Sequence, residues 1–340
     1  MRIAQFYHDF SQRGGAEKHV ETLAGSLNDL GHEVTIVSET PPRGFRGLVA
    51  NFGRYTAPVT ALRLALWMRR ERIQLVHAHS RISAMVASLA LGLYRIPLVV
   101  TSHILPEGLS RVSQWGDLTI CVSEAVQRRL IEAYGLAADQ TTVIHNGVEA
   151  GSGLSAPMLR LGPQPVISFV ARFAPGKGHE MFLEAAGRLL RGGFPGTFVL
   201  SGAGPLESSL RARYASDRIV FLGHRNDVPA ILAGSTASVV CSESEAFPYA
   251  VVESLAVGTP VVSTDCGGPA EIIRSGHNGF LFTVGDTQSL RRLLEAVSGP
   301  GSGLASRSEI AEECRTHFSR NQMVEATLTA YRKVCREVDA

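Results

Sequence analysis

The stretch ASVVCSESEAFPYAVVESLAVGTPVVST, residues 237–264, decides the fold of this chain. It begins with an apolar, β-prone run, Ala237–Cys241, and it ends with a second such run, Pro260–Thr264. A helical pattern, which Phe247-Pro248 precedes, lies between the two runs. A strand, a helix and a second strand in this order predict two parallel strands joined by a crossover helix.

The same alternation fills the rest of the chain in two blocks. The first block predicts strands at Ile3–Tyr7, Val34–Val37, Leu75–Ala78, Pro97–Thr101, Leu118–Val122 and Thr142–His145. The second block predicts further strands at Val166–Val170, Phe198–Ser201 and Ile219–Leu222. The clearest helical pattern ends at Gly31 and has one apolar face at Val20, Leu23, Leu27 and Leu30. We therefore predict an α/β protein with two Rossmann-like, doubly wound domains.

Composition changes between Glu149 and Pro165, where glycine, serine and proline gather as in a linker. We predict an N-terminal domain at 1–150, a linker at 151–164, a C-terminal domain at 165–318 and a helix at 319–340 that returns towards the N-terminal domain. The run Pro300–Gly303 predicts a further loop. Two doubly wound domains predict a cleft between them, and ligands of such sheets bind beyond the carboxyl ends of the strands.

The composition limits the class of protein. With 340 residues, 45% hydrophobic and 19% charged, the chain fits two globular domains. Its net charge of +2 is too small to predict a nucleic-acid or membrane partner. The five cysteines are scattered and predict reduced thiols rather than a metal site. No apolar run reaches the ~18 residues of a membrane span, and the N-terminus lacks the apolar region of a signal peptide, so a cytoplasmic location is expected.

Gly14 and Gly15 lie between the first predicted strand and the first predicted helix. Adjacent glycines allow the backbone to approach a ligand closely, and a helix N-terminus offers free N–H groups to an anion. The loop can therefore cradle a diphosphate, but a plain tight turn explains two glycines equally well. It is not the GxGxxG fingerprint of dinucleotide binding.

Arg172 and Lys177 follow the strand Val166–Val170 on a loop rich in glycine and proline. An arginine fork and a lysine ammonium five residues apart can reach one anion from two sides. Only three of the 33 basic residues are lysines, which favours a chemical role for Lys177 over that of a solvated surface cation.

Glu245 and Glu253 flank the start of the helix in the opening stretch. We expect the first turn to expose the backbone N–H groups of Tyr249, Ala250 and Val251 to a phosphate, next to Phe247. Two carboxylates on either side can accept hydrogen bonds from sugar hydroxyls. The alternative is that both acids only stabilise the helix N-terminus.

These motifs resemble those of the retaining glycosyltransferases with the GT-B fold, and glycosyltransferase family 4 is the nearest match. The resemblance covers nearly the whole chain. It rests on Gly14–Glu17, Thr101–His103, Val122–Ala125, His145–Val148, Arg172–Gly178, the pair Glu245/Glu253 with seven residues between, and Ala256–Val262. The resemblance implies two Rossmann-like domains that face each other across a cleft.

The chain departs from the pattern of the family at three points. Ala171 replaces the usual glycine before Arg172, Pro248-Tyr249 stands where many members have Gly-Leu, and the chain is short. Pro248-Tyr249 puts the pocket for the donor sugar in question. The bias towards arginine suggests an actinobacterial source and an antibiotic pathway, such as that of avilamycin.

The resemblance also implies roles for single residues. His103, Glu245, Arg172 and Lys177 are the expected catalytic residues, and Glu253 is expected to hold the ribose of a nucleotide-diphosphate sugar, most commonly a UDP-sugar. Gly202, His224 and Val228 are expected near the base. The sequence has no DxD motif, Glu243-Ser244-Glu245 being the nearest substitute, so we predict metal-independent transfer without a cofactor. The acceptor is expected to be a small molecule, an oligosaccharide or a lipid-linked hydroxyl compound.

Three other functions fit parts of the pattern. A hydrolysing UDP-sugar epimerase would use the same nucleotide grip. A nicotinamide dehydrogenase would share the strand–helix alternation but requires GxGxxG. A non-catalytic protein could bind a membrane through the basic, apolar stretch Leu62–Arg72, which we interpret as an ordinary crossover helix. His77 and His79 are interpreted as structural.

Overall fold

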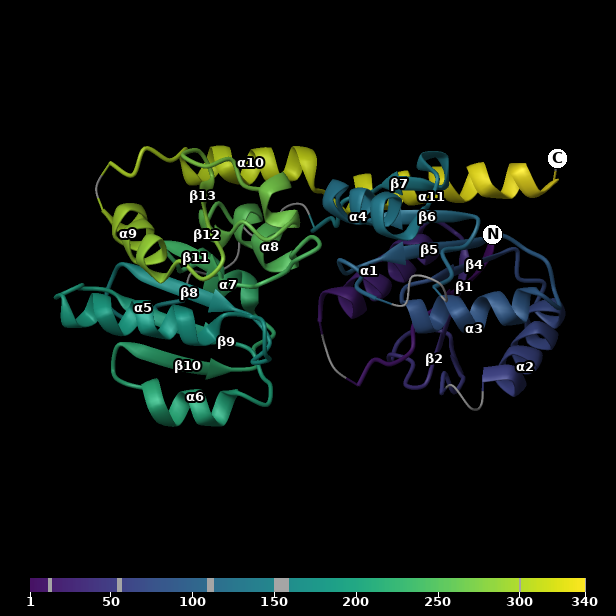
Figure 1. Cartoon of the computed structure of the whole chain (residues 1–340), viewed down its shortest axis with the longest axis horizontal. Helices are drawn as coiled ribbons and strands as arrows, with labels where there is room; N and C mark the ends of the chain where they lie inside the picture. Colours follow the sequence, from purple (N-terminus) through teal and green to yellow (C-terminus); the bar gives the residue numbers. More distant parts are fainter. Residues whose placement is uncertain (12–13, 54–56, 109–112, 150–158, 300, 340) are drawn as a thin grey trace. The chain divides into compact units, whose positions relative to one another are not determined.

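The computed structural model describes residues 1–11, 14–53, 57–108, 113–149, 159–299 and 301–339. The chain forms two compact units (Figure 1). Unit 1 comprises Met1–Asn146 together with Arg320–Ala340, and unit 2 comprises Gly147–Ser319. Residues 151–158 of the predicted linker, the preceding Ala150, and Pro300 of the second predicted loop lie outside the described residues.

Unit 1 is built on a seven-stranded parallel sheet in the order β3-β2-β1-β4-β5-β6-β7. Its strands are β1 (Arg2–Phe6), β2 (Glu33–Ser38), β3 (Gly47–Val49), β4 (Leu75–Ala78), β5 (Leu98–Ser102), β6 (Leu118–Cys121) and β7 (Thr141–Val143). Its helices are α1 (Gly15–Asp29), α2 (Ala57–Arg70), α3 (Arg81–Leu91), α4 (Glu124–Tyr134), the 3₁₀ turn η1 (Ala138–Gln140) and α11 (Arg320–Asp339).

Helix α1 buries the apolar face that its sequence predicts, with Val20, Leu23 and Leu27 in the core. The assignment of Leu30 to this face is wrong. The helix ends at Asp29, and Leu30 lies beyond it with 58% of its surface exposed. Gly31 follows in the left-handed region at φ 80°, a conformation that glycine adopts readily and that turns the chain towards β2.

Helix α11 is the last element of the chain, yet it packs in the core of unit 1. Its apolar side buries Met323, Val324, Leu328, Tyr331 and Val334 in the same cluster as residues of β1 and α1. The helical period of these five residues explains why one face of α11 is buried.

Unit 2 is built on a six-stranded parallel sheet in the order β10-β9-β8-β11-β12-β13. Its strands are β8 (Val166–Val170), β9 (Thr197–Ser201), β10 (Ile219–Gly223), β11 (Ala237–Val240), β12 (Val261–Thr264) and β13 (Gly279–Phe282). Its helices are α5 (His179–Arg191), α6 (Glu207–Tyr214), α7 (Val228–Ala233), α8 (Tyr249–Ala256), the 3₁₀ turn η2 (Gly268–Glu271), α9 (Thr287–Ser298) and α10 (Arg307–His317). Phe169, Phe173, Phe182 and Phe198 lie at the centre of its core.

The prediction of two doubly wound α/β domains is confirmed, since both sheets are parallel and alternate with helices along the chain. The quoted stretch forms the unit β11–α8–β12, and β11 pairs with β12 in parallel. Two strands, β3 and β13, were not predicted from the sequence. Among the described residues, none of the helices combines the length and the apolar character needed to cross a membrane.

Candidate active site

The sheet of unit 2 has a switch point between β8 and β11. From β8 the chain continues to β9 and β10 on one side, and from β11 it continues to β12 and β13 on the other. Because all the strands are parallel, the loops that follow them leave from the same edge of the sheet. In sheets of this type ligands bind at that edge, next to the switch point.

The predicted site residues of unit 2 lie on these loops. Arg172 and Lys177 follow β8, Gly202 follows β9, His224 follows β10, and Glu245 follows β11. The structure thus brings the basic pair and the carboxylate loop to the two strands that border the switch point.

Lys177 and Glu245 form an ion pair across this point. The Nζ atom of Lys177 lies 2.6 Å from Oε1 of Glu245, and the hydroxyl of Ser242 donates to the same oxygen at 2.7 Å. Their side chains are 27% and 16% exposed, so the pair is partly shielded from water but reachable by a ligand. Both groups are thereby held in place at the edge of the sheet.

Backbone hydrogen bonds hold the loops that carry this pair. The N–H of Glu243 donates to the carbonyl of Gly176 at 2.9 Å, which joins the β11 loop to the β8 loop. The N–H of Gly268 donates to the carbonyl of Glu245, also at 2.9 Å. A Cβ at Gly268 would lie 1.9 Å from the carbonyl oxygen of Ala246, so the close approach of the two segments requires glycine there.

Helix α8 begins at Tyr249, immediately after Pro248. The expectation that three N–H groups in its first turn face a ligand is wrong for Val251, whose N–H donates to the carbonyl of Pro248 at 3.1 Å. The ring of Phe247 is buried against Phe318, with 5.5 Å between the ring centroids, so this ring packs inside unit 2. Any ligand contact by Phe247 therefore involves its backbone.

Glu253 lies in α8 and is partly exposed. Burial and, to a smaller extent, the negative charge of Glu253 raise the pKa of Tyr249 well above its ordinary value. Tyr249 is therefore a neutral phenol at every physiological pH. The buried ring of Tyr249 belongs to the Pro248-Tyr249 pair, which stands where many members of the family have Gly-Leu.

The three residues expected near the base have different surroundings. Gly202 is tightly placed, since its N–H donates to the carbonyl of Gly223 at 2.9 Å and a Cβ there would lie 1.9 Å from the carbonyl oxygen of Ala171. His224 is exposed on the loop after β10. Val228 starts α7 and packs, partly buried, against an apolar cluster that includes Val257.

Unit 1 has its own switch point, between β1 and β4. Gly14 caps the N-terminus of α1 in an extended conformation, and Gly15 is the first residue of that helix. Gln12 and Arg13, which complete the predicted glycine loop, lie outside the described residues. His103 follows β5 directly, and His79 follows β4 directly.

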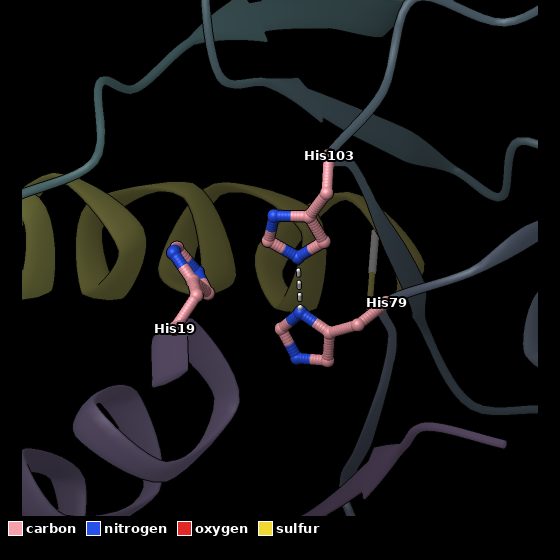
Figure 2. A group of neighbouring side chains, drawn as sticks. All are labelled: His19, His79 and His103. Carbon is pink, nitrogen blue, oxygen red and sulfur yellow. Dashed lines mark hydrogen bonds between the residues drawn. The ribbon is translucent and has the colours of Figure 1, made fainter. Parts of the chain in front are cut away.

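His103 lies in a group of histidines that sequence reasoning missed. Its Nε2 is 3.2 Å from Nδ1 of His79, and the ring of His19, from α1, lies 4.6 Å from its own ring (Figure 2). His79 therefore contacts the predicted catalytic residue, although the sequence indicated only a structural role. His77 does fit that role, because hydroxyls of Tyr331 and Thr101 lie within 2.7 Å of its two nitrogens.

Burial keeps these imidazoles neutral. It lowers the pKa of His19 to about 4, against a weaker opposing effect of the hydrogen bond to Asn146. Burial, and then the neighbouring histidines, lower the pKa of His77, His79 and His103 well below the ordinary value. At neutral pH all four therefore have a lone pair on one ring nitrogen.

Comparison with known families agrees with this architecture. Residues 13–151 match the model described as Glycosyltransferase Family 4, and residues 164–298 match the model described as Glycosyl transferases group 1. The protein is therefore a glycosyltransferase with two GT-B-like domains, of which the first matches the family 4 model and the second matches the group 1 model.

Its relatives are enzymes of the same class. The chain is 27% identical to the phosphatidyl-myo-inositol mannosyltransferase of Mycolicibacterium smegmatis, over 85% of this chain and 82% of the relative. It is 28% identical to the D-inositol 3-phosphate glycosyltransferase of Mycobacterium tuberculosis, over 78% of this chain. In that second case it spans only 63% of the length of the relative.

Solved structures show the same fold. HepE of Anabaena in complex with UDP superposes with a TM-score of 0.82 at 20% identity, covering 98% of this chain and 100% of that chain. Sucrose-phosphate synthase from Thermosynechococcus elongatus superposes with a TM-score of 0.81 at 18% identity, covering 98% of each chain.

Proposed function

We propose that this glycosyltransferase moves a sugar from a UDP-sugar to a hydroxyl acceptor, with retention of anomeric configuration and without a metal ion at the diphosphate. The observation that carries the proposal is the Lys177–Glu245 pair at the switch point of unit 2, with Arg172 on the same loop as Lys177. It supplies both charges that a sugar diphosphate needs: a cation for phosphate and a carboxylate for hydroxyls.

The ammonium group of Lys177 has further N–H donors beside the one that contacts Glu245. An ammonium group has three N–H bonds, and the contact with Glu245 uses one of those of Lys177, so the others are left for phosphate oxygens. The guanidinium of Arg172 adds a planar fork on the same loop. The N-terminus of α8 adds the positive end of a helix dipole.

The carboxylates have matching roles in the proposal. Lys177 and Ser242 both bind Oε1 of Glu245, so Oε2 is the oxygen that we assign to a hydroxyl of the transferred sugar. Glu253, partly exposed on α8, is assigned to the ribose. Gly202, His224 and Val228 are assigned to the base pocket, since they lie on loops at the same edge or directly after one.

The reaction breaks the bond between the anomeric carbon and the phosphate oxygen, and the electron pair leaves with the diphosphate. The acceptor oxygen bonds to the anomeric carbon on the same face, and its proton passes to the departing phosphate oxygen. Lys177, Arg172 and the α8 N-terminus stabilise the developing negative charge. Glu245 is paired with Lys177, which favours charge stabilisation by Lys177 and Arg172 over metal binding by Glu243-Ser244-Glu245.

In unit 1 we assign a catalytic role to His103 and a contact with a phosphate group to the loop at Gly14-Gly15, and we assign the acceptor side to this domain. Both follow strands at the edge of that sheet where the switch point lies. The names of the two mycobacterial relatives each contain an inositol compound, so myo-inositol phosphates and phosphatidylinositol are the first acceptors to test.

A thermal-shift screen against UDP-, GDP-, ADP- and dTDP-sugars, with and without EDTA, tests the donor. We expect the largest stabilisation from a UDP-sugar and the same shift in EDTA. A shift that EDTA abolishes would overturn metal independence, and a larger shift with another nucleotide would overturn the choice of uridine.

Proton NMR of the product tests the stereochemistry and the class of reaction. We expect the anomeric configuration of the donor to persist in the product. Inversion would contradict the retaining mechanism. Formation of free UDP and an epimerised sugar without any acceptor would indicate the hydrolysing epimerase instead.

A further inference from the structure

Two imidazole rings of unit 1, those of His79 and His103, are in direct contact (Figure 2). Nδ1 of His79 lies 3.2 Å from Nε2 of His103. His79 directly follows β4, and His103 directly follows the neighbouring strand β5. The ring planes are within 20° of parallel, and Figure 2 shows the two nitrogens pointing towards each other. Because the N–H bonds and lone pairs of imidazole lie in the plane of the ring, this arrangement suits a hydrogen bond.

The direction of that hydrogen bond decides which nitrogen of His103 carries the proton. Burial, and then the neighbouring histidines, lower the pKa of both rings well below the ordinary value, so both are neutral at pH 7. A neutral imidazole has one N–H and one bare nitrogen. One ring of the pair therefore donates the bond, and the other ring accepts it.

The surroundings of His79 favour one of the two directions. Its Nε2 is buried and has no hydrogen-bond partner among the residues that the structure describes. A proton on Nε2 would thus be a buried N–H without an acceptor, which is rarer in folded proteins than a buried acceptor without a donor. We infer that the proton of His79 lies on Nδ1, which donates to Nε2 of His103.

The same bond determines the state of His103. Since Nε2 of His103 accepts, its own proton lies on Nδ1, because the bond made by one ring nitrogen sets the protonation of the other. His103 is partly exposed, whereas His79 is only 2% exposed. His103 is therefore the ring of the pair that a ligand can reach, and it offers that ligand an N–H rather than a base.

The ring of His79 is held in place by its neighbour His77. The centroids of the two rings are 3.9 Å apart, and hydroxyls of Tyr331 and Thr101 lie within 2.7 Å of the two nitrogens of His77. A side chain that is fixed by packing and by bonded neighbours can orient a residue of the site without touching the substrate.

We propose that His79 is a positioning residue of the transfer reaction, and that its Nδ1–H keeps His103 in the tautomer with the proton on Nδ1. His103 then donates a hydrogen bond to an oxygen of the substrate and does not act as a base. The inference rests on the proposed function, in which the proton of the acceptor passes to the departing phosphate oxygen and no basic side chain is required.

NMR spectroscopy of the full chain with ¹⁵N-labelled histidine tests the tautomer without any substrate. Long-range ¹H–¹⁵N correlations distinguish the protonated from the bare ring nitrogen, and each signal is assigned by its loss in a single-histidine variant. We expect the proton on Nδ1 in both His79 and His103. A proton on Nε2 of His103 would overturn the proposal.

Variants of His79 test its effect on the reaction. His79→Leu removes the donor, so we expect His103 to lose its preference for the Nδ1 tautomer and kcat to fall about 10–100-fold. His79→Asn places an amide N–H close to the position of Nδ1 and should restore both the tautomer and most of the turnover. His277→Leu is the matched control: it removes an imidazole of unit 2 that pairs with Glu313 and should change neither readout.

Circular dichroism shows which variants are folded. Wild-type turnover in folded His79→Leu, or an Nδ1 tautomer of His103 that persists in this variant, would contradict the positioning role. If His79→Leu fails to fold, the wild-type spectrum and His79→Asn decide the question. A chain that has the expected tautomer but transfers no sugar would contradict the proposed function, and not the hydrogen bond between His79 and His103.

Discussion

Lys177 is one of three lysines in a chain that otherwise uses arginine for its basic residues. That scarcity predicted a chemical role, and the structure adds a partner for the ammonium group. Glu245 lies 2.6 Å away, so the residues to which the sequence assigned phosphate and sugar contacts are in direct contact with each other. The sequence could not predict this contact, because 68 positions separate the two residues.

We predict that Lys177→Ala lowers the turnover number by at least about 10²–10³-fold, the usual loss when one preorganised donor to a developing oxyanion is removed. Steady-state kinetics at saturating donor measure this. Lys333→Ala is the matched control, since it removes an exposed lysine of α11 in unit 1 and should keep the wild-type rate. Near-normal turnover of Lys177→Ala would remove the support for the proposed site.

Several residues show the limit of sequence reasoning. The run at Phe247 to Val251 was correctly identified as a helix start, but the direction of a ring or an N–H depends on packing. Phe247 turns into the core, and the N–H of Val251 bonds to Pro248. His19 was missed because its partners lie after β4 and β5, on strands that meet α1 only in the folded unit. The predicted antibiotic pathway stays a prediction.

At the scale of elements, the loop between β8 and α5 depends on a close approach of backbone. Gly178 precedes α5 in the left-handed region at φ 74°, and a Cβ there would lie 2.1 Å from the carbonyl oxygen of Cys241. Gly193 has a similar φ, 86°, and a Cβ there would meet open space. Replacing Gly193 by alanine therefore tests the backbone conformation alone, whereas replacing Gly178 tests the same conformation together with the clash.

We predict that Gly193→Ala costs about 1–2 kcal/mol of stability, the price of an alanine in the left-handed region. Gly178→Ala should cost about 1–3 kcal/mol more, because the loop must move away from Cys241. Urea unfolding of both variants measures the difference. Equal destabilisation would show that the β8 and β11 loops do not need this contact.

Helix α11 contributes a polar contact to unit 1 as well as apolar packing. The hydroxyl of Tyr331 lies 2.6 Å from Nδ1 of His77, and both side chains are fully buried. We predict that Tyr331→Phe destabilises unit 1 by about 1–3 kcal/mol, because a buried nitrogen loses its partner.

Tryptophan fluorescence measures this loss in unit 1 alone, since Trp67 and Trp115 are the only tryptophans of the chain. Tyr94→Phe is the control, because Tyr94 is only partly buried at the edge of an apolar cluster. It should change stability by less than about 0.5 kcal/mol. An equal effect of the two substitutions would argue against a role for the Tyr331 hydroxyl.

Most strands could be predicted because buried parallel strands are continuous apolar runs. Each of the two missed strands lies at one edge of its sheet. β3 has only three residues, of which two are exposed, and β13 begins with a glycine and buries two of its four residues. An edge strand covered on fewer sides has a weaker apolar pattern, so its sequence resembles that of a loop.

At the scale of the whole molecule, unit 1 contains three buried histidines, His19, His77 and His79, and the partly buried His103, all of them neutral. Each has a folded pKa below its unfolded value of about 6.5. As pH falls below 6.5, these histidines bind protons in the unfolded chain but stay unprotonated in the folded unit. The stability from these groups is therefore complete above about pH 6.5 and declines at lower pH, for His19 down to about pH 4.

We predict that the free energy of unfolding of unit 1 falls between pH 6.5 and 4 with a slope above the ~1.4 kcal/mol per pH unit of a single proton. Urea unfolding followed by tryptophan fluorescence measures it. His19→Gln should make the slope shallower. A flat profile would mean that the folded unit accepts these protons at the ordinary pKa.

Unit 2 is one continuous segment placed between the two segments of unit 1. Its two ends lie side by side, because the N–H of Val148 donates to the carbonyl of Phe318 at 2.9 Å. A ribosome therefore delivers every residue of unit 2 before it delivers α11. All residues of unit 2 are therefore available for folding before those of unit 1. Unit 1 can form its contact between Tyr331 and His77 only after α11 has been synthesised. A chain that ends at Ser319 would contain every residue of unit 2 but would lack the α11 segment of unit 1.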